Sequence, residues 1–512
     1  MSLWEEDYNI PSFPAVTADD SADVIIVGGG ITGITAAYLL TKANVSVILI
    51  DADRLVNGTT GHTTAKITAQ HGLIYDELIQ HTDKTKARLH YEGATDALNM
   101  IKETVESLAI DCDFVHKDAV LYAENDVYAR KLEREAMAYK TLNIPYETID
   151  GPPDLQAVGG LRMPDQAEFH PIKYLSSLVH YITKHGGRIY EQTVATDLSK
   201  DDRPEVITRV GHRLQGSHVL VCSHFPFFEG NQFYFTRMYA ERSYILAIKP
   251  KQMPAEDDMY LNPEDPVRSI RKMSFKGEEL LLIGGEQHKT GQGRATSSHY
   301  EALETFAKKH FGIERIVDRW SAQDLTTIDK LPIIGRMSDA HPNVYVSTGY
   351  RKWGMTTGTL AAMILSDAVQ LKQNRYASLY SPNRFYANPS IATFLRENLN
   401  VSKHLLLGKL DLTNQSLDDL NTNEAIVFKH NGQRKGAFKD AENHIHIVDT
   451  TCTHLGCEVA WNDGDHTWDC PCHGSRFSYT GDVIEGPAET PLQTHDHSLF
   501  TNLDTKDDSS GW

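Results

Sequence analysis

The hydrophobic pattern at the start of the chain predicts a buried strand, a helix and a second buried strand. Residues 23–27, DVIIV, and 45–50, VSVILI, are short runs of apolar and β-branched residues, as expected of parallel strands covered on both faces. Between them, ITAAYLLTKAN repeats apolar residues at helical spacing. A strand, a helix and a parallel strand make a βαβ unit, so an α/β domain is expected here.

The pattern changes towards the C-terminus. From about residue 411, short runs such as EAIVFKH and HIHIVD alternate apolar and polar positions between turn residues, which predicts a small antiparallel β domain. The stretch before it is polar and contains several prolines, which indicates a connecting segment. The predicted division is therefore 1–370 for the larger domain, 371–410 for the connecting segment and 411–512 for the small domain.

The length, composition and charge of the chain limit the classes of protein to which it can belong. A chain of 512 residues is too long for one hydrophobic core, and 40% hydrophobic with 23% charged residues is ordinary for a globular protein. The net charge of −19 argues against nucleic acid or anionic lipid as the main partner. The sequence shows neither a signal peptide nor an apolar run of about 18 residues, so we expect a cytoplasmic protein without an integral membrane segment.

A glycine motif joins the first strand to the helix. Gly28, Gly30 and Gly33 fit G-x-G-x-x-G: the first permits a tight turn, the second lets backbone amides approach a pyrophosphate, and the third lets the helix pack closely. Asp51, at the end of the second strand, is spaced to accept hydrogen bonds from an adenosine ribose. The complete unit predicts a dinucleotide at the N-terminus of the helix. No second unit of this kind follows to hold a nicotinamide nucleotide beside a flavin.

A single unit of this kind at the start of a long chain resembles the FAD-dependent oxidoreductases of the D-amino-acid oxidase and glycine oxidase superfamily. Residues 57–72, NGTTGHTTAKITAQHG, resemble the family segment that leads to the flavin ring. Residues 168–198 resemble its mid-chain helix and strand, and TTIDKLPIIGR with residues 343–369 resembles its C-terminal FAD-binding strand and helix. The likeness covers about residues 20–370.

The resemblance implies FAD as a cofactor and an α/β Rossmann-like FAD-binding domain with an interleaved antiparallel-sheet substrate domain. It places a backbone contact to adenine at Val194, and it places the segment from Gly349 to Thr356 near the isoalloxazine ring and its pyrimidine edge. The FAD-binding residues that it implies are Gly28, Gly30, Thr32, Gly33, Asp51, Gly61, Thr63, Thr64, Val194, Gly349, Gly354, Met355 and Thr356.

One position departs from the family pattern. Many amino-acid oxidases of this group carry an arginine just before a T-x-D-x-x-P motif, where it pairs with the substrate carboxylate. The matching position here is Asp324, with Arg319 or Arg336 as substitutes if the register is shifted. Because an acidic side chain repels a carboxylate and attracts a cation, we expect an amine or another C–H substrate. Asp324 and His62, the latter within the segment that approaches the flavin, are the catalytic candidates.

Two cysteine and histidine pairs lie in the small domain. Cys452 and His454, and Cys470 and His473, offer two thiolates and two imidazoles from two loops. Zinc accepts a Cys2His2 set, but zinc sites mainly space cysteine with cysteine and histidine with histidine. One cysteine and one histidine on each loop suit a 2Fe–2S cluster in which one iron takes two thiolates and the other takes two imidazoles.

The stretch CTHLGC and the later CPCHGS resemble a Rieske domain of the type found in cytochrome bc complexes. The resemblance implies that Cys452 and Cys470 bind one iron, that His454 and His473 bind the other, and that Cys457 and Cys472 form a disulfide. It also implies a shielding loop at GPA, residues 486–488.

Two further positions of the likeness bear on the reduction potential. Ser475 matches a serine whose hydroxyl donates to a cluster sulfur, whereas the family tyrosine two residues later is Phe477 here. With one donor lost, we expect a potential below that of respiratory Rieske proteins, within the Rieske range of about −150 to +300 mV.

Together the two parts predict an FAD-dependent oxidoreductase with a Rieske cluster. A small-molecule substrate gives a hydride to FAD, electrons pass singly from the flavin to the cluster, and an external partner accepts them. Two alternatives stay open: reverse flow from an external donor through the cluster to FAD, and a non-enzymatic redox sensor.

Overall fold

The computed structural model describes residues 2–8, 10–199, 201–385, 387–410 and 416–500. The chain forms two compact units. Unit 1 comprises Met1–Gln287 and His299–Phe394, and unit 2 comprises His288–Ser298 and Leu395–Trp512. Unit 2 is therefore built from two stretches that are separated in the sequence by about a hundred residues of unit 1.

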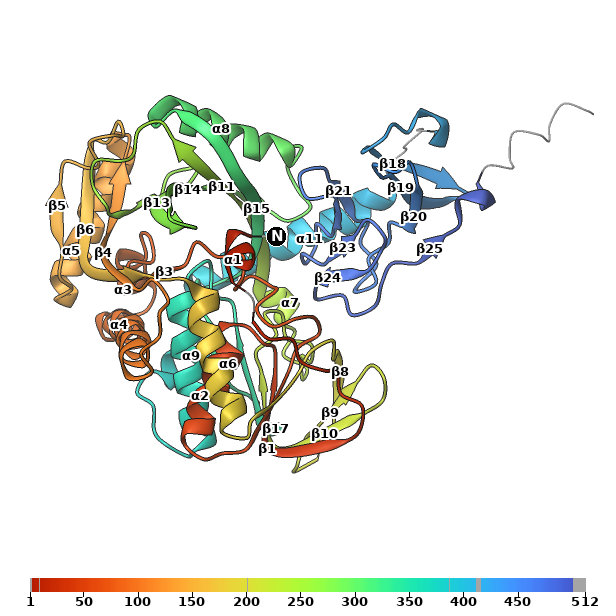
Figure 1. Ribbon diagram of the computed structural model, residues 1–512, viewed down its shortest axis with the longest axis horizontal. Helices are drawn as coiled ribbons and strands as arrows, with labels where there is room; N and C mark the ends of the chain where they lie inside the picture. Colours follow the sequence, from red (N-terminus) through yellow and green to blue (C-terminus); the bar gives the residue numbers. More distant parts are fainter. Residues whose placement is uncertain (1, 9, 200, 386, 411–415, 501–512) are drawn as a thin grey trace, which may run out of the picture. The chain divides into compact units, whose positions relative to one another are not determined.

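The first sheet of unit 1 contains the α/β arrangement predicted from the N-terminal pattern (Figure 1). Its central strand β1 pairs in parallel with β2 and β10, and β17 pairs in parallel with β10. The strands in spatial order are β16 (Ile333–Ser338), β17 (His341–Thr348), β10 (Arg213–Val221), β1 (Asp20–Val27), β2 (Val47–Ile50) and β7 (Arg188–Tyr190), with β9 (Glu205–Thr208) and β8 (Ala195–Leu198) joined through β10.

Helices cover this sheet and bury its apolar side chains. Helix α2 packs against α6 and α9, and α4 packs against α9, so the helices form one layer with a continuous core beneath them (Figure 1). Asp83, Asn125 and His170 cap α4, α5 and α6 by accepting hydrogen bonds from backbone amides of the first turn, and of these α5 packs on strands 115–123 and 159–168 rather than on this sheet. The bounds are α1 (Leu3–Asp7), α2 (Ile31–Lys42), α3 (Tyr75–His81), α4 (Lys84–Ser107), α5 (Asp126–Leu142), α6 (Pro171–Lys184) and α9 (Gly354–Val369).

A second sheet alternates with the first along the sequence. It is antiparallel except where β12 pairs with β4, and its longest pairing joins β11 to β15. Helix α8 (Ser297–His310) packs on it, with Tyr300 and Leu303 in the same core as Tyr244. The order is β15 (Ile313–Thr327), β11 (Met238–Pro250), β14 (Glu278–Lys289), β13 (Arg268–Phe275), β12 (Met259–Asn262), β4 (Val115–Ala123), β6 (Gly159–Glu168) and β3 (Lys66–Ile67), with β5 (Glu147–Ile149) on β6 and α7 (Tyr234–Arg237) before β11.

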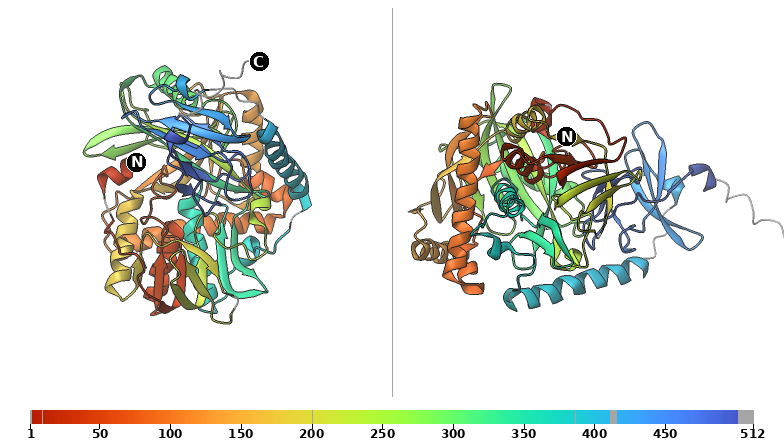
Figure 2. Two further views of the ribbon diagram at one scale, coloured as in Figure 1. Left: turned by 90° about the vertical axis from the view of Figure 1, so that its right-hand side faces the viewer. Right: turned by 90° about the horizontal axis from the view of Figure 1, so that it is seen from below.

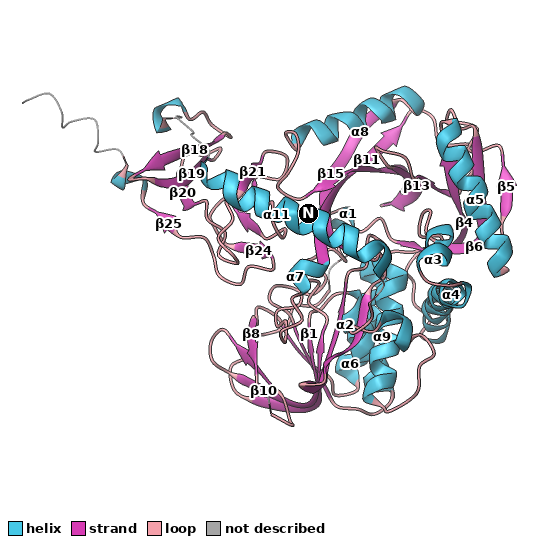
Figure 3. Cartoon of the chain, turned by 180° about the vertical axis from the view of Figure 1, so that it is seen from behind, coloured by secondary structure: helices cyan, strands magenta, loops and turns pink. Residues whose placement is uncertain are grey.

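Unit 2 contains two small antiparallel sheets and part of a long helix (Figure 3). One sheet is β18 (Ala425–His430), β19 (Gln433–Lys439), β20 (Ile445–Asp449) and β25 (Thr494–His495); the other is β21 (Ala460–Asn462), β22 (Thr467–Asp469), β23 (Arg476–Ser478) and β24 (Val483–Glu485). Short 3-10 turns lie at η1 (Leu417–Asp419) and η2 (His497–Leu499).

The stretch between the two predicted domains is mostly helical. It holds α10 (Ala377–Tyr380) and α11 (Ala387–Leu410), and the latter is one continuous helix (Figure 2). Val401 and Leu405 of α11 pack on the core that contains the cysteines of unit 2.

The predicted fold class, an α/β Rossmann-like domain with an interleaved antiparallel sheet and a small all-β domain, is confirmed. Among the described residues, no helix has the length and apolar character required to span a bilayer.

The close packing of α2 on the glycine turn gives a first prediction. A Cβ at Gly33 would lie 1.9 Å from the Gly28 carbonyl oxygen, which is backbone and cannot rotate away. Gly33→Ala should destabilise the protein by about 1–3 kcal/mol and reduce its FAD content, measured by thermal unfolding and flavin absorbance. Gly58→Ala is the matched control, because a Cβ there meets nothing within 4 Å. Equal effects of the two variants would contradict the prediction.

Candidate functional site

The glycine turn between β1 and α2 is held by its own amides, since those of Gly28, Gly29 and Ile31 donate to Ile50, Asp51 and Thr60. Gly28 has φ +111°, and a Cβ there would lie 2.4 Å from the carbonyl oxygen of Cys222. Gly30 is the N-cap of α2 and has no side chain to occupy the space before the helix. The first amides of a helix have no partner within the helix, so the start of α2 after Ile31, whose amide donates to Thr60, fits the pyrophosphate of a dinucleotide.

Asp51 lies at the end of β2, beside this turn. Its carboxylate accepts hydrogen bonds from the amides of Gly29, at 2.6 Å, and Asp53, at 2.9 Å. Burial raises its pKa to about 6, against the lowering effect of these two amides. Val194 lies near the same strand end, because the neighbouring Thr193 donates its amide to the Asp51 carbonyl oxygen. The structure thus brings the predicted ribose and adenine contacts together.

The segment after β2 folds back over the glycine turn. Thr60 Oγ1 accepts the Ile31 amide at 3.1 Å, and the Val56 amide donates to the Gly29 carbonyl oxygen. Gly61 packs closely, since a Cβ there would lie 2.5 Å from the Val56 carbonyl oxygen. The following predicted residues, Thr63 and Thr64, continue from this loop towards β3.

The predicted FAD segment at the start of α9 contacts the start of α2, although the two are far apart in the sequence. Tyr350 and Thr32 share a hydrogen bond of 2.8 Å between their hydroxyl groups, which joins the start of α9 to the start of α2. A Cβ at Gly358 would lie 2.8 Å from side-chain atoms of Ile31 and Thr32. Gly349 has φ +77°, and the α9 residues Gly354, Met355 and Thr356 follow directly.

The backbone between Gly349 and α9 is strained. Arg351 and Lys352 both have positive φ, +48° and +68°, although neither is glycine. Such residues cost about 1–3 kcal/mol each and persist only where the surroundings hold them. Here the Arg351 amide donates to the Leu325 carbonyl oxygen, and its guanidinium donates to the His71 carbonyl oxygen at 2.7 Å.

One face of the paired strands β11 and β15 contacts the loop of residues 57–64. Trp320 on that face donates its indole N–H to the His62 carbonyl oxygen at 3.0 Å, and Thr59 Oγ1 donates to the Gln323 carbonyl oxygen. Asp324 lies on the same face as Trp320, because side chains alternate along a strand. His62 itself contacts the Gly58 carbonyl oxygen through Nδ1 at 2.9 Å, within its own loop.

A second carboxylate, which the sequence analysis missed, lies directly opposite Asp324. Glu241 of β11 is its cross-strand partner, so the two acids share one face of the sheet. Thr326 Oγ1 donates to Glu241 at 2.9 Å, and Asp324 accepts from the Lys352 amide. Burial raises the pKa of Asp324, opposed by the positive charge of neighbouring groups that include Lys352. Only the register of two strands 83 positions apart could have identified this pair.

The two arginines considered as substitutes lie elsewhere. Arg319 pairs with Leu246 on the opposite face of β15, and its guanidinium lies 5.1 Å from the centre of the Tyr300 ring. Arg336 is exposed on β16. Neither shares the face of Asp324, so the described side chains of this face offer acids rather than an arginine at that position.

The cysteine and histidine loops of unit 2 come together as two thiols and two imidazoles. Cys452 and Cys470 are buried and not in a disulfide, and the rings of His454 and His473 lie 5.0 Å apart, edge to face. The hydrogen bond between the two thiols lowers the pKa of Cys452 to about 7 and raises that of Cys470, so Cys452 is the first to ionise, and burial lowers the pKa of both imidazoles. Neutral imidazoles and ionisable thiols are the donor set that a Rieske cluster requires, so these residues fit it.

A disulfide joins the two loops, as the Rieske likeness implied. Cys457 and Cys472 are bonded, and their sulfurs lie within 4.8 Å of the sulfur of Cys470. Since two of these three sulfurs are in the disulfide, only Cys470 among them can act as a thiolate ligand. Val401 of α11 lies over the disulfide, its carbonyl oxygen 3.9 Å from Cys472 Sγ.

The shielding loop fixes the orientation of Ser475. The Ala488 amide donates to Ser475 Oγ at 3.0 Å, which leaves the hydroxyl proton for the Cys452 sulfur, with which Ser475 also forms a hydrogen bond. Phe477 is fully buried in the same core and offers no second donor.

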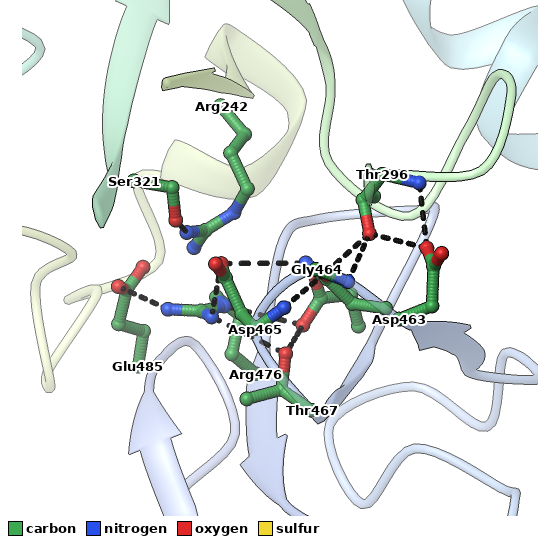
Figure 4. Close-up of polar contacts among 11 residues, drawn as sticks. Arg242, Thr296, Ser321, Asp463, Gly464, Asp465, Thr467, Arg476 and Glu485 are labelled. Atoms are coloured by element: carbon green, nitrogen blue, oxygen red, sulfur yellow. Dashed lines mark hydrogen bonds and ion pairs between the residues drawn. The ribbon is translucent and has the colours of Figure 1, made fainter. Parts of the chain in front are cut away.

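The stretch 288–298 completes unit 2 beside the cysteine loop. Gln292 Nε2 donates to the Pro471 carbonyl oxygen at 2.7 Å, and a Cβ at Gly291 would lie 2.9 Å from the Cys470 carbonyl carbon. Thr296 binds the turn between β21 and β22: its amide donates to Asp463 at 2.7 Å, and its hydroxyl accepts from Gly464 at 2.8 Å (Figure 4). The cysteine loop is therefore held from outside the small β domain itself.

Comparison with known proteins assigns both parts of the chain. Residues 23–368 match the family of FAD dependent oxidoreductases, and residues 413–496 match the Rieske [2Fe-2S] domain. A Bacillus subtilis (strain 168) protein described as a Rieske 2Fe-2S iron-sulfur protein, YhfW, is 49% identical over 97% of either chain.

More distant similarities cover unit 1. Gamma-glutamylputrescine oxidoreductase of Escherichia coli (strain K12) is 22% identical over 71% of this chain and 87% of its own. Glycine oxidase from Geobacillus kaustophilus superposes with a TM-score of 0.61 at 19% identity, covering 72% of this chain and 99% of its own. The cofactors that the two matched families bind, FAD and a 2Fe–2S cluster, are the cofactors of this chain.

The environment of Phe477 gives a prediction for the cluster. Phe477→Tyr should add a hydroxyl donor in the core that contains Cys452 and Cys470 and raise the midpoint potential, because donors to cluster sulfurs stabilise the reduced form. Protein-film voltammetry measures the shift, and Phe477→Leu controls for altered packing. An unchanged or lower potential for the tyrosine variant would show that the hydroxyl does not reach a sulfur.

Proposed function

Because this chain belongs to the FAD-dependent oxidoreductase family and carries a Rieske domain, we propose that it oxidises a small amine-like substrate and passes the electrons through the cluster to an external acceptor. FAD accepts a hydride and releases electrons one at a time, and the cluster takes them singly. The presence of both cofactors on one chain supports transfer between them, since a covalent link raises the effective concentration of one partner for the other.

The proposal that the substrate is amine-like rests on the paired carboxylates of Glu241 and Asp324. Like charges directly opposite each other on neighbouring strands destabilise a sheet unless a cation lies between them. Lys352 is attracted to both acids, so one lysine is shared between two carboxylates. The two acids disfavour a substrate carboxylate at this position, and a substrate ammonium group would take the place of the attraction that Lys352 and Arg351 now supply.

Neighbouring side chains support this recognition. Thr326 holds one oxygen of Glu241, and the Lys352 amide holds Asp324, so both carboxylates are positioned before a substrate arrives. The Arg351 guanidinium donates to the His71 carbonyl oxygen and is attracted to Glu77 and, more weakly, to Glu241. The name of the Escherichia coli relative, gamma-glutamylputrescine oxidoreductase, is in keeping with an amine substrate.

In this proposal the cofactor ligands are those implied by the family likeness. Cys452 and Cys470 hold one iron, and His454 and His473 hold the other. The glycine turn, Asp51 and the start of α9 hold FAD. The chain's residues bind and orient these groups, and their burial excludes water from the thiols and from Asp324.

A reductive titration tests the order of electron flow. Anaerobic addition of amines, amino acids and hydroxy acids should bleach the flavin absorbance with an amine, and the EPR signal of the reduced cluster should then appear. A flavin that is reduced while the cluster stays oxidised contradicts intramolecular transfer. A cluster potential well below that of the flavin would instead favour the reverse direction.

Substitution of the acid pair tests the substrate class. Asp324→Asn and Glu241→Gln should each raise KM for an amine substrate about 10- to 100-fold, since a hydrogen bond to a charged group contributes about 1.5–3 kcal/mol. Ser243→Ala, on the same face but without charge, is the matched control. Asp324→Asn should also leave thermal stability unchanged or higher, because burial is the largest influence on Asp324 and disfavours its charged form. Unchanged KM values would refute the role of the pair.

A further inference from the structure

Within unit 2, a side chain of the stretch 288–298 binds the peptide unit between two cysteines of the small β domain. Gln292 Nε2 donates to the Pro471 carbonyl oxygen at 2.7 Å. Pro471 stands between Cys470, which is not in a disulfide, and Cys472, which is bonded to the other cysteine loop. The contact therefore falls on the backbone of the loop that carries one of the two thiols.

Close packing and a second partner hold Gln292 in this place. Gly291 has φ +68°, and a Cβ there would lie 2.7 Å from the Pro471 nitrogen and 2.8 Å from the Asp469 carbonyl oxygen. Gln292 also donates to Asn400 Oδ1 of α11 at 2.8 Å. Since a carbonyl oxygen only accepts, the nitrogen of the Gln292 side-chain amide, and not its oxygen, faces Pro471.

The other end of the same peptide unit is directed at the Cys470 sulfur. The backbone amide of Cys472 donates to Cys470 Sγ, as does that of His473. The C=O and N–H groups of a trans peptide point in opposite directions, so the unit has a donor at its carbonyl oxygen and an acceptor at its amide. The series runs from Gln292 Nε2 through the Pro471–Cys472 peptide and ends on the sulfur of Cys470.

Hydrogen bonds arranged in series strengthen one another. A donor at the carbonyl oxygen polarises the peptide, so its N–H becomes a stronger donor by about 10–30%. As an iron ligand Cys470 is a thiolate, and reduction of a cluster adds negative charge that its sulfurs share. A stronger donor at this sulfur therefore stabilises the reduced state more than the oxidised state.

We propose that Gln292 is a positioning residue for the iron-sulfur cluster, which polarises the Pro471–Cys472 peptide towards Cys470 Sγ and so raises the reduction potential. The inference rests on the proposed ligation of iron by Cys470, and on neither the substrate nor the direction of electron flow. Gln292 lies outside residues 413–496, which match the Rieske domain, and inside residues 23–368, which match the FAD-dependent family. One part of the chain thus adjusts the cofactor of the other.

Gln292→Met tests the proposal in the full-length holoprotein, because it keeps the length of the side chain and removes the amide donor. We expect the reduced cluster to be disfavoured about threefold, a fall of about 30 mV in the midpoint potential at about 59 mV per tenfold change for one electron. Protein-film voltammetry measures the shift. Gln292→Lys, which supplies a donor again, should restore the potential at least to that of the unaltered protein.

Thr296→Val is the matched control. The Thr296 hydroxyl ties the same stretch to Asn462 and Asp463 at the turn between β21 and β22 (Figure 4), so its removal loosens the stretch but leaves the donor to Pro471. An unchanged potential in Gln292→Met, or equal shifts in the two variants, overturns the proposal. Loss of iron and sulfide from Gln292→Met also overturns it, since the contact then serves only to hold the loop.

Resonance Raman spectroscopy gives a second measurement at the sulfur itself. A hydrogen bond to a thiolate ligand weakens its bond to iron, so Gln292→Met should raise the iron–cysteine stretching frequency and reduce its shift in deuterated water. Frequencies identical to those of the unaltered protein contradict the series.

The failure of this inference can be told apart from the failure of the proposed function. If no substrate bleaches the flavin, the proposed oxidation fails, while the potential set at an electrode and the Raman frequencies still stand. An unaltered protein without a Rieske-type EPR signal refutes the ligand set itself, and with it this inference.

Discussion

The contact between the start of α2 and the glycine turn is the constraint on which unit 1 depends. Gly33 has no side chain, so the helix approaches within a distance that a Cβ would prevent. That approach lets Thr32 of the same helix meet Tyr350, and lets the Ile31 amide meet Thr60. One close packing contact therefore gathers three segments that are far apart in the sequence around the N-terminus of the helix.

The strained turn before α9 is a second feature of unit 1 on which the structure depends, and it costs conformational free energy. Two consecutive non-glycine residues in the left-handed region cost a few kcal/mol, which the surrounding hydrogen bonds to β15 and His71 must offset. The result places Lys352 beside the acids of β11 and β15 and Trp353 on the ring of His71. The turn is thus tied to β15 on one side and to the loop of His71 on the other, and these contacts maintain its strain.

In unit 2, several contacts hold two short loops beside each other around the sulfurs of the cysteines. The disulfide fixes the loops to each other, the shielding loop orients Ser475, and the stretch 288–298 holds the carbonyl oxygen of Pro471. Small domains have little core to stabilise such loops, so added covalent and polar contacts are expected. The long helix α11 supplies further apolar cover through Val401 and Leu405.

The sequence by itself determined the features whose chemistry is local. The glycine turn with Asp51, and the two loops of one cysteine and one histidine each, depend on spacings of a few residues, and so the cofactors could be predicted from them. Helix α11 could not be predicted in this way, because its polar, proline-containing sequence has weak hydrophobic periodicity. Its apolar residues pack on a core formed by a later part of the chain.

Only the tertiary structure decided which distant residues meet. Glu241 faces Asp324 because of the register of β11 with β15, and His71, His90 and Tyr380 meet because a loop and the helices α4 and α10 converge. The same is true of 288–298, a loop between a strand and a helix of unit 1 that completes unit 2. Strand register and helix packing depend on the apolar surface that is buried across the whole domain. A short stretch of sequence does not show which distant residues will bury that surface.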